Sequence, residues 1–80
     1  MSIKQGSIVK AVAGRDRDRF FVVLKTEGRF AYIADGKTRK IDKPKRKKLI
    51  HLAKTDYTAE GSYETNPQLK KILYQFNNGG

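Results

Sequence analysis

The middle of the chain is rich in residues that suit contact with phosphate groups. Eight of the twelve residues in the segment 37–48 are basic, and Asp42 is the acid among them. Cations at this density repel one another, and a phosphate backbone would relieve that repulsion and release counterions. Pro44 stiffens the segment and lowers the entropic cost of ordering it on binding. A solvated turn or a localisation signal is the alternative interpretation of such a run. The candidate nucleic-acid contacts in this segment are Lys37, Arg39, Lys40, Lys43, Lys45, Arg46, Lys47 and Lys48.

A second group of candidate contacts lies in the segment 15–19, where arginine alternates with aspartate. Exposed ion pairs of this kind contribute about 0–1 kcal/mol, so these residues could simply neutralise one another. Alternatively, the planar guanidinium groups of Arg15, Arg17 and Arg19 bind phosphate with two hydrogen bonds each and stack on bases. Both interpretations stay open at the level of the sequence.

Aromatic residues follow the same basic segments. Phe20, Phe21, Phe30 and Tyr32 could stack on unpaired bases. Because Phe is so often buried, a core role is preferred for most of the four. The better stacking candidates are Tyr32, Tyr57 and Tyr63.

The residue inventory points away from catalysis and metal binding. His51 is the single histidine and there is no cysteine, so the usual nitrogen and sulfur ligands cannot form a metal centre. No paired carboxylates, Ser-His-Asp set or phosphate-cradling glycine loop can be assembled. We therefore expect a binding protein, not an enzyme, with no cofactor, no metal and no small-molecule substrate.

The charge of the chain is unevenly distributed. Eighteen Lys and Arg residues stand against eight Asp and Glu, a net charge of +10. Residues 1–54 hold sixteen basic and five acidic side chains, whereas residues 55–80 hold two and three. A field of this strength attracts polyanions, and nucleic acid is the commonest such partner. Charge kept only for solubility is the alternative, but it does not require such segregation.

The elements that position the basic residues read as β-structure in a single domain. Residues 35–36 are Asp-Gly, the favoured pair for a two-residue hairpin. Five short strands with tight turns predict a small SH3-like barrel, because closing the sheet removes its exposed edges. The expected strands cover residues 6–13, 19–25, 29–34, 37–41 and 47–52.

The last third of the chain predicts a polar connection over residues 55–65 and a helix over residues 66–78. Asn66 reads as the N-cap and Pro67 as the first helical residue. Leu69, Ile72, Leu73 and Phe76 share one helix face by their spacing. In the strand 19–25, Phe20 and Val22 face one way and Phe21 the other, so both faces are apolar. We expect the helix to cover the outer face of that strand, and its removal to expose Phe21.

Two stretches of the chain resemble the KOW domain family. The β-rich run from Gly6 to Gly14 leads into a charged loop and then into the apolar strand at residues 19–23, which is similar to the KOW pattern. The stretch 32–37, the Lys-Pro-Lys-Arg-Lys of residues 43–47 and His51-Leu52 narrow the resemblance. With these stretches, the chain resembles bacterial KOW-containing RNA-binding proteins. Those proteins are themselves similar to the archaeal and eukaryotic fourteen-e family of large-subunit ribosomal proteins. The resemblance covers about residues 5–53 of the chain.

The resemblance implies an SH3-like barrel over residues 1–54 and RNA as the partner, either ribosomal RNA or another structured RNA, with the ribosome as its setting. It also implies that the loop of residues 15–19 contacts RNA. Asp18 stands where KOW loops carry a second glycine, and Asp tolerates a positive φ better than most residues. The C-terminal helix lies outside the resemblance.

Two other classes of protein fit the same residues: an SH3-like protein-interaction module of the transcription or translation machinery, and a DNA-binding protein. No apolar run reaches the roughly 20 residues that span a bilayer. The first six residues have no signal-peptide pattern. We expect a soluble, cytoplasmic protein without a membrane partner.

Overall fold

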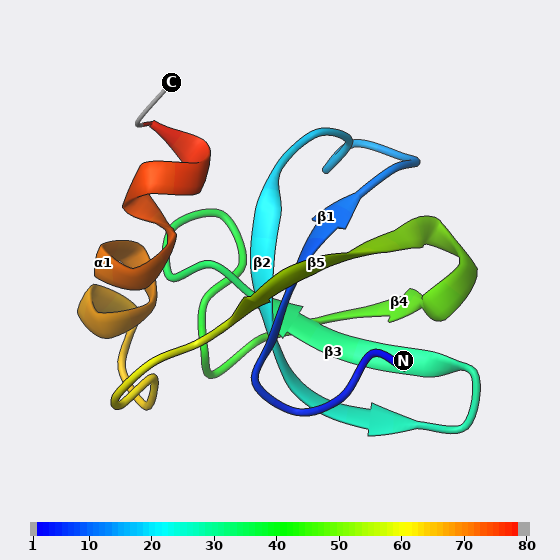
Figure 1. The fold of residues 1–80 in the computed structure, drawn as a ribbon, viewed down its shortest axis with the longest axis horizontal. Helices are drawn as coiled ribbons and strands as arrows, with labels where there is room; N and C mark the ends of the chain where they lie inside the picture. The colour runs from blue at the N-terminus through cyan, green and yellow to red at the C-terminus, as the bar shows by residue number, and fades with distance from the viewer. Residues whose placement is uncertain (1, 79–80) are drawn as a thin grey trace.

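Apolar residues in alternation build a five-stranded antiparallel sheet, and a helix packs on one side of it (Figure 1). The computed structural model describes residues 2–78. The strand order is β4-β3-β2-β1-β5, so β4 and β5 are the two edges of the sheet. This confirms a mostly-β fold with a C-terminal helix. The elements are β1 (Ser7–Ala11), β2 (Phe20–Glu27), β3 (Phe30–Ala34), β4 (Lys45–Lys48), the 3-10 turn η1 (Leu49–His51), β5 (Leu52–Thr58) and α1 (Asn66–Asn77).

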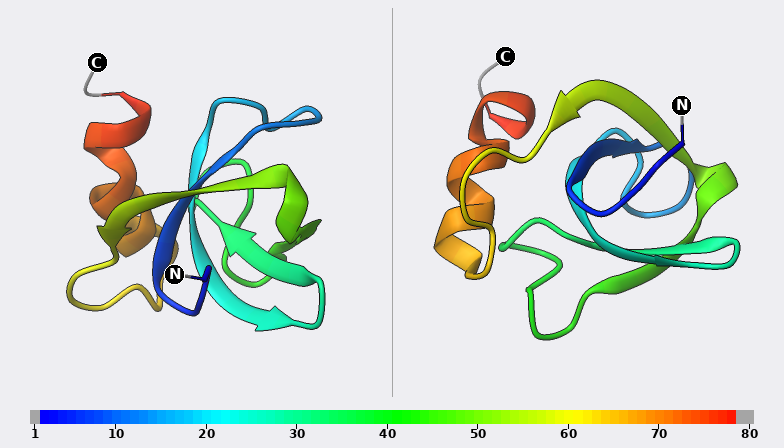
Figure 2. Two further views of the ribbon diagram at one scale, coloured as in Figure 1. Left: turned by 45° about the vertical axis from the view of Figure 1, so that its right-hand side comes forward. Right: turned by 60° about the horizontal axis from the view of Figure 1, so that its bottom comes forward.

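Each face of the sheet buries its own apolar cluster, because β2 is apolar on both faces. The sheet curves strongly, and α1 stands against its outer side (Figure 2). The inner cluster consists of Val9, Ala11, Phe21, Val23, Ala31, Ile33 and Leu52. The outer cluster, beneath α1, consists of Ile8, Val22, Ala34, Leu69 and Leu73.

The helix forms where the sequence predicts it, with a different cap. Thr65, not Asn66, is the N-cap: its hydroxyl accepts from the Gln68 N–H, and the Gln68 side chain accepts from the Thr65 N–H. This reciprocal capping box satisfies two backbone donors that a helix start leaves free. Asn66 instead accepts a hydrogen bond from the Ile41 N–H at 2.8 Å. The cap therefore leaves Asn66 free to hold the start of the helix against a loop of the sheet.

The helix covers the other face of β2 from the one expected. Leu69 and Leu73 are buried against Val22, while Phe21 lies in the inner cluster away from the helix. The expectation that loss of the helix would expose Phe21 is therefore wrong, and Val22 is the residue that α1 shields. Alternation along β2 separates the two faces but does not say which one the sheet curls around.

Residues 37–41, expected to be a return strand after a two-residue hairpin, are instead part of a loop that spans residues 35–44. The Asp35 carboxylate accepts from the backbone N–H groups of Lys37 and Arg39, which bends the chain back on itself. Gly36 has φ +80°, and a Cβ there would overlap the Asn66 carbonyl. The strand that pairs with β3 is β4, a few residues later.

The expected last strand, residues 47–52, is divided among β4, η1 and the first residue of β5, and β5 continues to Thr58. β5 pairs with β1, with Val9 opposite Lys54 and Ser7 opposite Thr58. Residues 55–58 therefore belong to the sheet and not to the polar connection. This segment has no regular alternation of apolar residues, and its strand conformation depends on long-range pairing with β1.

Asp18 tolerates a positive φ in the loop between β1 and β2, as expected. Asp18 has φ 71°, the left-handed conformation that a second loop glycine would adopt most easily. Its N–H donates to the Ala11 carbonyl at 2.8 Å. The tight return from β1 to β2 therefore accommodates an aspartate at a position with positive φ.

Candidate nucleic-acid interface

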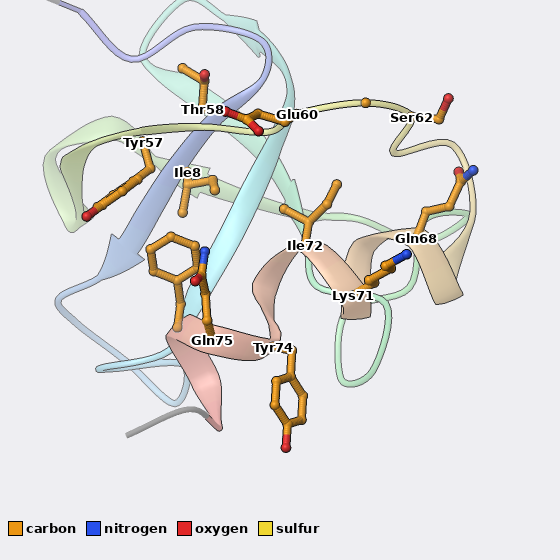
Figure 3. Close-up of a pocket in the computed structure, with 12 residues that line it drawn as sticks. Ile8, Tyr57, Thr58, Glu60, Ser62, Gln68, Lys71, Ile72, Tyr74 and Gln75 are labelled. Atoms are coloured by element: carbon orange, nitrogen blue, oxygen red, sulfur yellow. The ribbon is translucent and has the colours of Figure 1, made fainter.

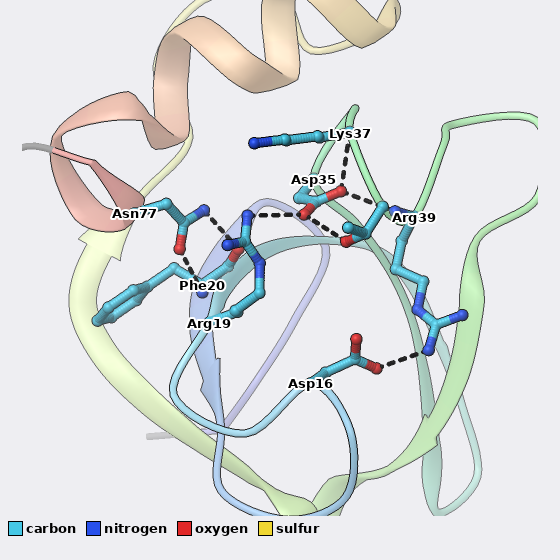
Figure 4. Close-up of polar contacts among 8 residues, drawn as sticks. Asp16, Arg19, Phe20, Asp35, Lys37, Arg39 and Asn77 are labelled. Carbon is cyan, nitrogen blue, oxygen red and sulfur yellow. Dashed lines mark hydrogen bonds and ion pairs between the residues drawn. The ribbon is translucent and has the colours of Figure 1, made fainter.

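Two basic loops are joined by reciprocal ion pairs (Figure 4). The 12–19 loop connects β1 to β2, and the 35–44 loop connects β3 to β4. Asp16 of the first loop accepts from Arg39 of the second at 2.9 Å, and Asp35 of the second accepts from Arg19 of the first at 3.3 Å. Each loop thus supplies one acid and one arginine, and the two loops hold each other in place.

Asp35 is the centre of this junction. It is 2% exposed. Its Oδ1 accepts from the N–H groups of Lys37 and Arg39, and its Oδ2 accepts from the Thr38 hydroxyl and from Arg19. Burial alone would raise the pKa of Asp35, but these donors, the Arg39 N–H foremost, outweigh it and lower the pKa below its ordinary value of 3.8. The carboxylate is therefore charged at neutral pH and fixes the shape of the 35–44 loop.

Lys47 is a structural residue as well. It is 9% exposed, and its Nζ donates to the Ala13 carbonyl at 2.8 Å and lies 3.9 Å from Asp16. In β4 it pairs with Ala31, on the side of the inner cluster. Lys47 therefore ties the edge strand to the 12–19 loop.

The structure divides the predicted contacts into two groups. Arg19, Arg39 and Lys47 are engaged inside the protein by Asp35, Asp16 and Ala13. The other predicted contacts are exposed on the two joined loops and on β4, and we call them the basic surface. The basic surface consists of Arg15, Arg17, Lys37, Lys40, Lys43, Lys45, Arg46 and Lys48.

The helix adds a cation that sequence reasoning missed. Arg19, Lys37 and Lys70 line a small pocket of about 230 Å³ between α1 and the 35–44 loop. Asn77 anchors the far end of α1 nearby: its side chain accepts from the Phe20 N–H at 2.9 Å and donates to the Phe20 carbonyl at 3.1 Å (Figure 4). No periodicity links residues 70 and 37, so only the packing of the helix brings their charges together.

The aromatic residues proposed for base stacking lie in different parts of the structure. Phe21 lies in the inner cluster, and Phe20 packs under α1 with its ring 5.3 Å from that of Phe76. Tyr57 lies edge-on to Phe76 at 5.2 Å, and Tyr63 packs beside the outer cluster. The core interpretation thus holds for Phe20 and Phe21.

Phe30 and Tyr32 belong to neither apolar cluster of the described residues. The Arg46 guanidinium carbon lies 4.0 Å from the centre of the Phe30 ring, and Lys25 Nζ lies 4.7 Å from the centre of the Tyr32 ring. Such contacts depend on strand pairing, so the spacing of residues along the sequence does not reveal them.

A cavity beside α1 is a different environment (Figure 3). It holds about 820 Å³ between α1 and residues 57–62, with Ile8, Ile72 and Phe76 in its wall. Lys71 and Glu60 are its two charged side chains, and they are of opposite sign. This cavity therefore has no cationic character to attract a polyanion. Within residues 2–78, no three His, Cys, Asp or Glu side chains gather into a group that could hold a metal ion.

In the described part of the chain, the one helix is too short and too polar to cross a membrane. No protein-family model matches the chain, and no curated protein matches its sequence at a significant level.

Proposed function

We propose that this chain is an RNA-binding protein without catalytic activity, and that the basic surface is its RNA contact. The observation that carries the proposal is the pair of reciprocal Asp–Arg contacts between the 12–19 and 35–44 loops. They use two buried acids to hold the two loops together while most of the cations stay exposed. Fixed loops lose less entropy on binding than free ones, and unpaired cations release counterions from a phosphate backbone.

We further propose that the sheet is an SH3-like barrel of the KOW type. The five antiparallel strands, their curvature around one apolar cluster and the short η1 turn between the two edge strands support this fold. The positive φ of Asp18 supports the KOW loop. By its resemblance to KOW proteins the chain would act in the cytoplasm, on ribosomal RNA or another structured RNA.

Binding in rising salt concentrations tests the proposal. Single-stranded RNA and DNA of one sequence, and duplex RNA, are titrated with the protein, because the salt slope counts phosphate contacts. We expect binding at low salt with a preference for RNA. Preference for DNA would favour a DNA-binding protein. If neither nucleic acid binds at low salt, the proposal fails and the protein-interaction module is the remaining alternative.

A matched pair of double variants assigns the contact to a surface. Replacing Lys40 and Lys43 by Gln should lower the slope of log K against log salt by about 0.7 for each lost contact to a single strand. The control replaces the exposed Lys4 and Lys71 by Gln, which removes the same charge elsewhere. Equal losses from both pairs would mean that net charge, and not the basic surface, drives binding.

A further inference from the structure

The part of the outer sheet face that the helix leaves open carries two neighbouring aromatic rings. Phe30 and Tyr32 are two positions apart on β3, so their side chains emerge on the same face. Both are only half-buried, whereas Ala34, the next residue on that face, is buried beneath α1. A strand rises about 3.3 Å per residue, so the two rings begin roughly 7 Å apart.

Strand pairing surrounds these rings with cations. Arg46 pairs with Tyr32 and Lys48 with Phe30 across the β3–β4 ladder. On the other side, a bulge between Val23 and Lys25 shifts the register of β2, so that Lys25 comes opposite Tyr32. Without the bulge, Lys25 would share the inner face with Val23. The irregularity therefore turns a lysine outward to the aromatic pair.

Each ring is covered by a cation in the free protein. Arg46 lies over Phe30 and Lys25 lies over Tyr32, at 4.0 and 4.7 Å from the ring centres. The acid on this face, Glu27, accepts the Tyr32 hydroxyl at 3.2 Å and holds that ring in place. Every base presents a π-face, so a base can replace the cation on each half-buried ring. The displaced cation can then bind the phosphate of the same nucleotide.

The face continues past Phe30 into a pocket. This pocket holds about 620 Å³ and is lined by Gly28, Arg29, Phe30, Lys48, Leu49 and Ile50. Its wall is mostly apolar with two cations at its rim, and Ile50 is 80% exposed. Space for a flat ring beside cations suits an unpaired nucleotide, because each nucleotide carries a stacking base and a phosphate in one unit. The acidic side chains of a peptide supply the negative charge without a ring.

We propose that this face binds an unpaired segment of RNA, with bases stacked on Phe30 and Tyr32 and phosphates bound by Lys25, Arg46 and Lys48. The inference rests on the proposed function and assigns the class of RNA. In a duplex the π-faces are hidden within the stack, so a duplex could contact the cations but not the rings. The basic surface then supplies affinity for any RNA, and the aromatic pair selects single strands.

The test compares binding of a single-stranded RNA of mixed sequence with binding of its duplex. Phe30→Leu and Tyr32→Leu should each weaken single-strand binding by roughly ten-fold, as expected for the loss of one stacked base. The salt slope should not change, because no phosphate contact is lost. Duplex binding should also stay the same. Tyr32→Phe, which keeps the ring, should bind single strands nearly as well as the unmodified protein.

Tyr74→Leu is the matched control, since Tyr74 is 62% exposed and points outward from α1 (Figure 3). A loss of single-strand affinity in that variant alone would move stacking to the helix and overturn the proposal. If the variants fold poorly, a direct measurement on the unmodified protein still tests the proposal. The ring protons of Phe30 and Tyr32 should shift in the NMR spectrum on titration with the single strand, but not with the duplex.

Unchanged affinity in the Leu variants together with unmoved ring signals would refute the stacking site. If RNA still binds in that case with its salt slope reduced by loss of Lys40 and Lys43, the proposed function stands without it. If neither single strand nor duplex binds at low salt, both proposals fail. Self-association through this face would appear as concentration-dependent ring shifts without RNA, and it would replace RNA as the occupant.

Discussion

Asp35→Asn is the change that tests most directly how the two loops are held. The substitution keeps the size of the side chain but replaces one acceptor oxygen by an N–H donor group. That group would face the Thr38 hydroxyl and Arg19, which both donate to Oδ2 of the native carboxylate. The variant therefore removes the ion pair to the 12–19 loop and places an amide donor against the Arg19 guanidinium, whereas the Thr38 hydroxyl can rotate and accept from the amide.

The expected loss follows from burial and from the number of partners. Asp35 is 2% exposed and accepts four hydrogen bonds, and bonds to a charged group contribute about 1.5–3 kcal/mol each. The bond to Arg19 is lost and the other three become bonds to a neutral amide, and Arg19 is partly exposed, so we expect about 2–3 kcal/mol of destabilisation after allowance for solvent screening. For a domain of this size the melting temperature should fall by about 10–20 °C.

The same residue determines a pH dependence. The folded pKa of Asp35 is lowered, so its carboxylate stabilises the folded state fully above the unfolded pKa of about 3.9. That stabilisation is lost as the pH falls through the lower folded pKa. The Asp35→Asn variant has no carboxylate at this position, so acid removes nothing from it there. The difference in melting temperature between the variant and the unmodified protein should therefore narrow below about pH 4.

Thermal unfolding followed by circular dichroism between pH 7 and pH 2 measures both effects. Asp42→Asn is the control, because Asp42 is an exposed acid of the same loop and its loss changes the net charge equally. We expect that variant to melt within about 2 °C of the unmodified protein, since surface changes are usually worth less than 0.5 kcal/mol. Equal melting temperatures for both variants at pH 7 would show that Asp35 does not anchor the loops.

Three further changes test the packing. Leu73→Ala should cost about 2–5 kcal/mol, because Leu73 is fully buried beneath the sheet, and chemical denaturation measures the loss. Gly36→Ala should destabilise the protein by at least 1 kcal/mol, on the order of the strain at positive φ, since the new Cβ meets the Asn66 carbonyl; retained stability would contradict this close approach. Lys47→Ala should lower the melting temperature and leave the salt slope of RNA binding almost unchanged, because Lys47 is engaged with the Ala13 carbonyl; a reduced slope would return it to the interface.

Local features of the chain were predictable because they depend on neighbours in the sequence. The helix face of Leu69, Ile72 and Leu73 follows from a 3.6-residue period, and that period is a property of the helix alone. The resemblance to KOW loops singled out Asp18, and its positive φ is one that Asp tolerates better than most residues. The opposite orientations of Phe21 and Val22 follow from the two-residue period of a strand.

Features that depend on pairing between distant segments were not predictable. Asp35-Gly36 has the residue pair of a hairpin, but residues 35–44 form a loop because the strand that pairs with β3 is β4. Packing of Gly36 against Asn66 of the helix also lies beyond the reach of local patterns. The extension of β5 past residue 54 depends on the available edge of β1. Single-sequence patterns contain no information on which edge is free.

The composition, the order of the residues and their spacing by themselves determined that this is a strongly basic chain with one β-rich segment, one amphipathic helix and cations concentrated in residues 1–54. Tertiary structure alone decided which cations are free. Arg19, Arg39 and Lys47 have the same residue types as their exposed neighbours, and only the folded positions of Asp16, Asp35 and Ala13 engage them. The physical reason is distance: an ion pair or a hydrogen bond acts over a few ångströms, and folding sets that separation between residues up to 34 positions apart.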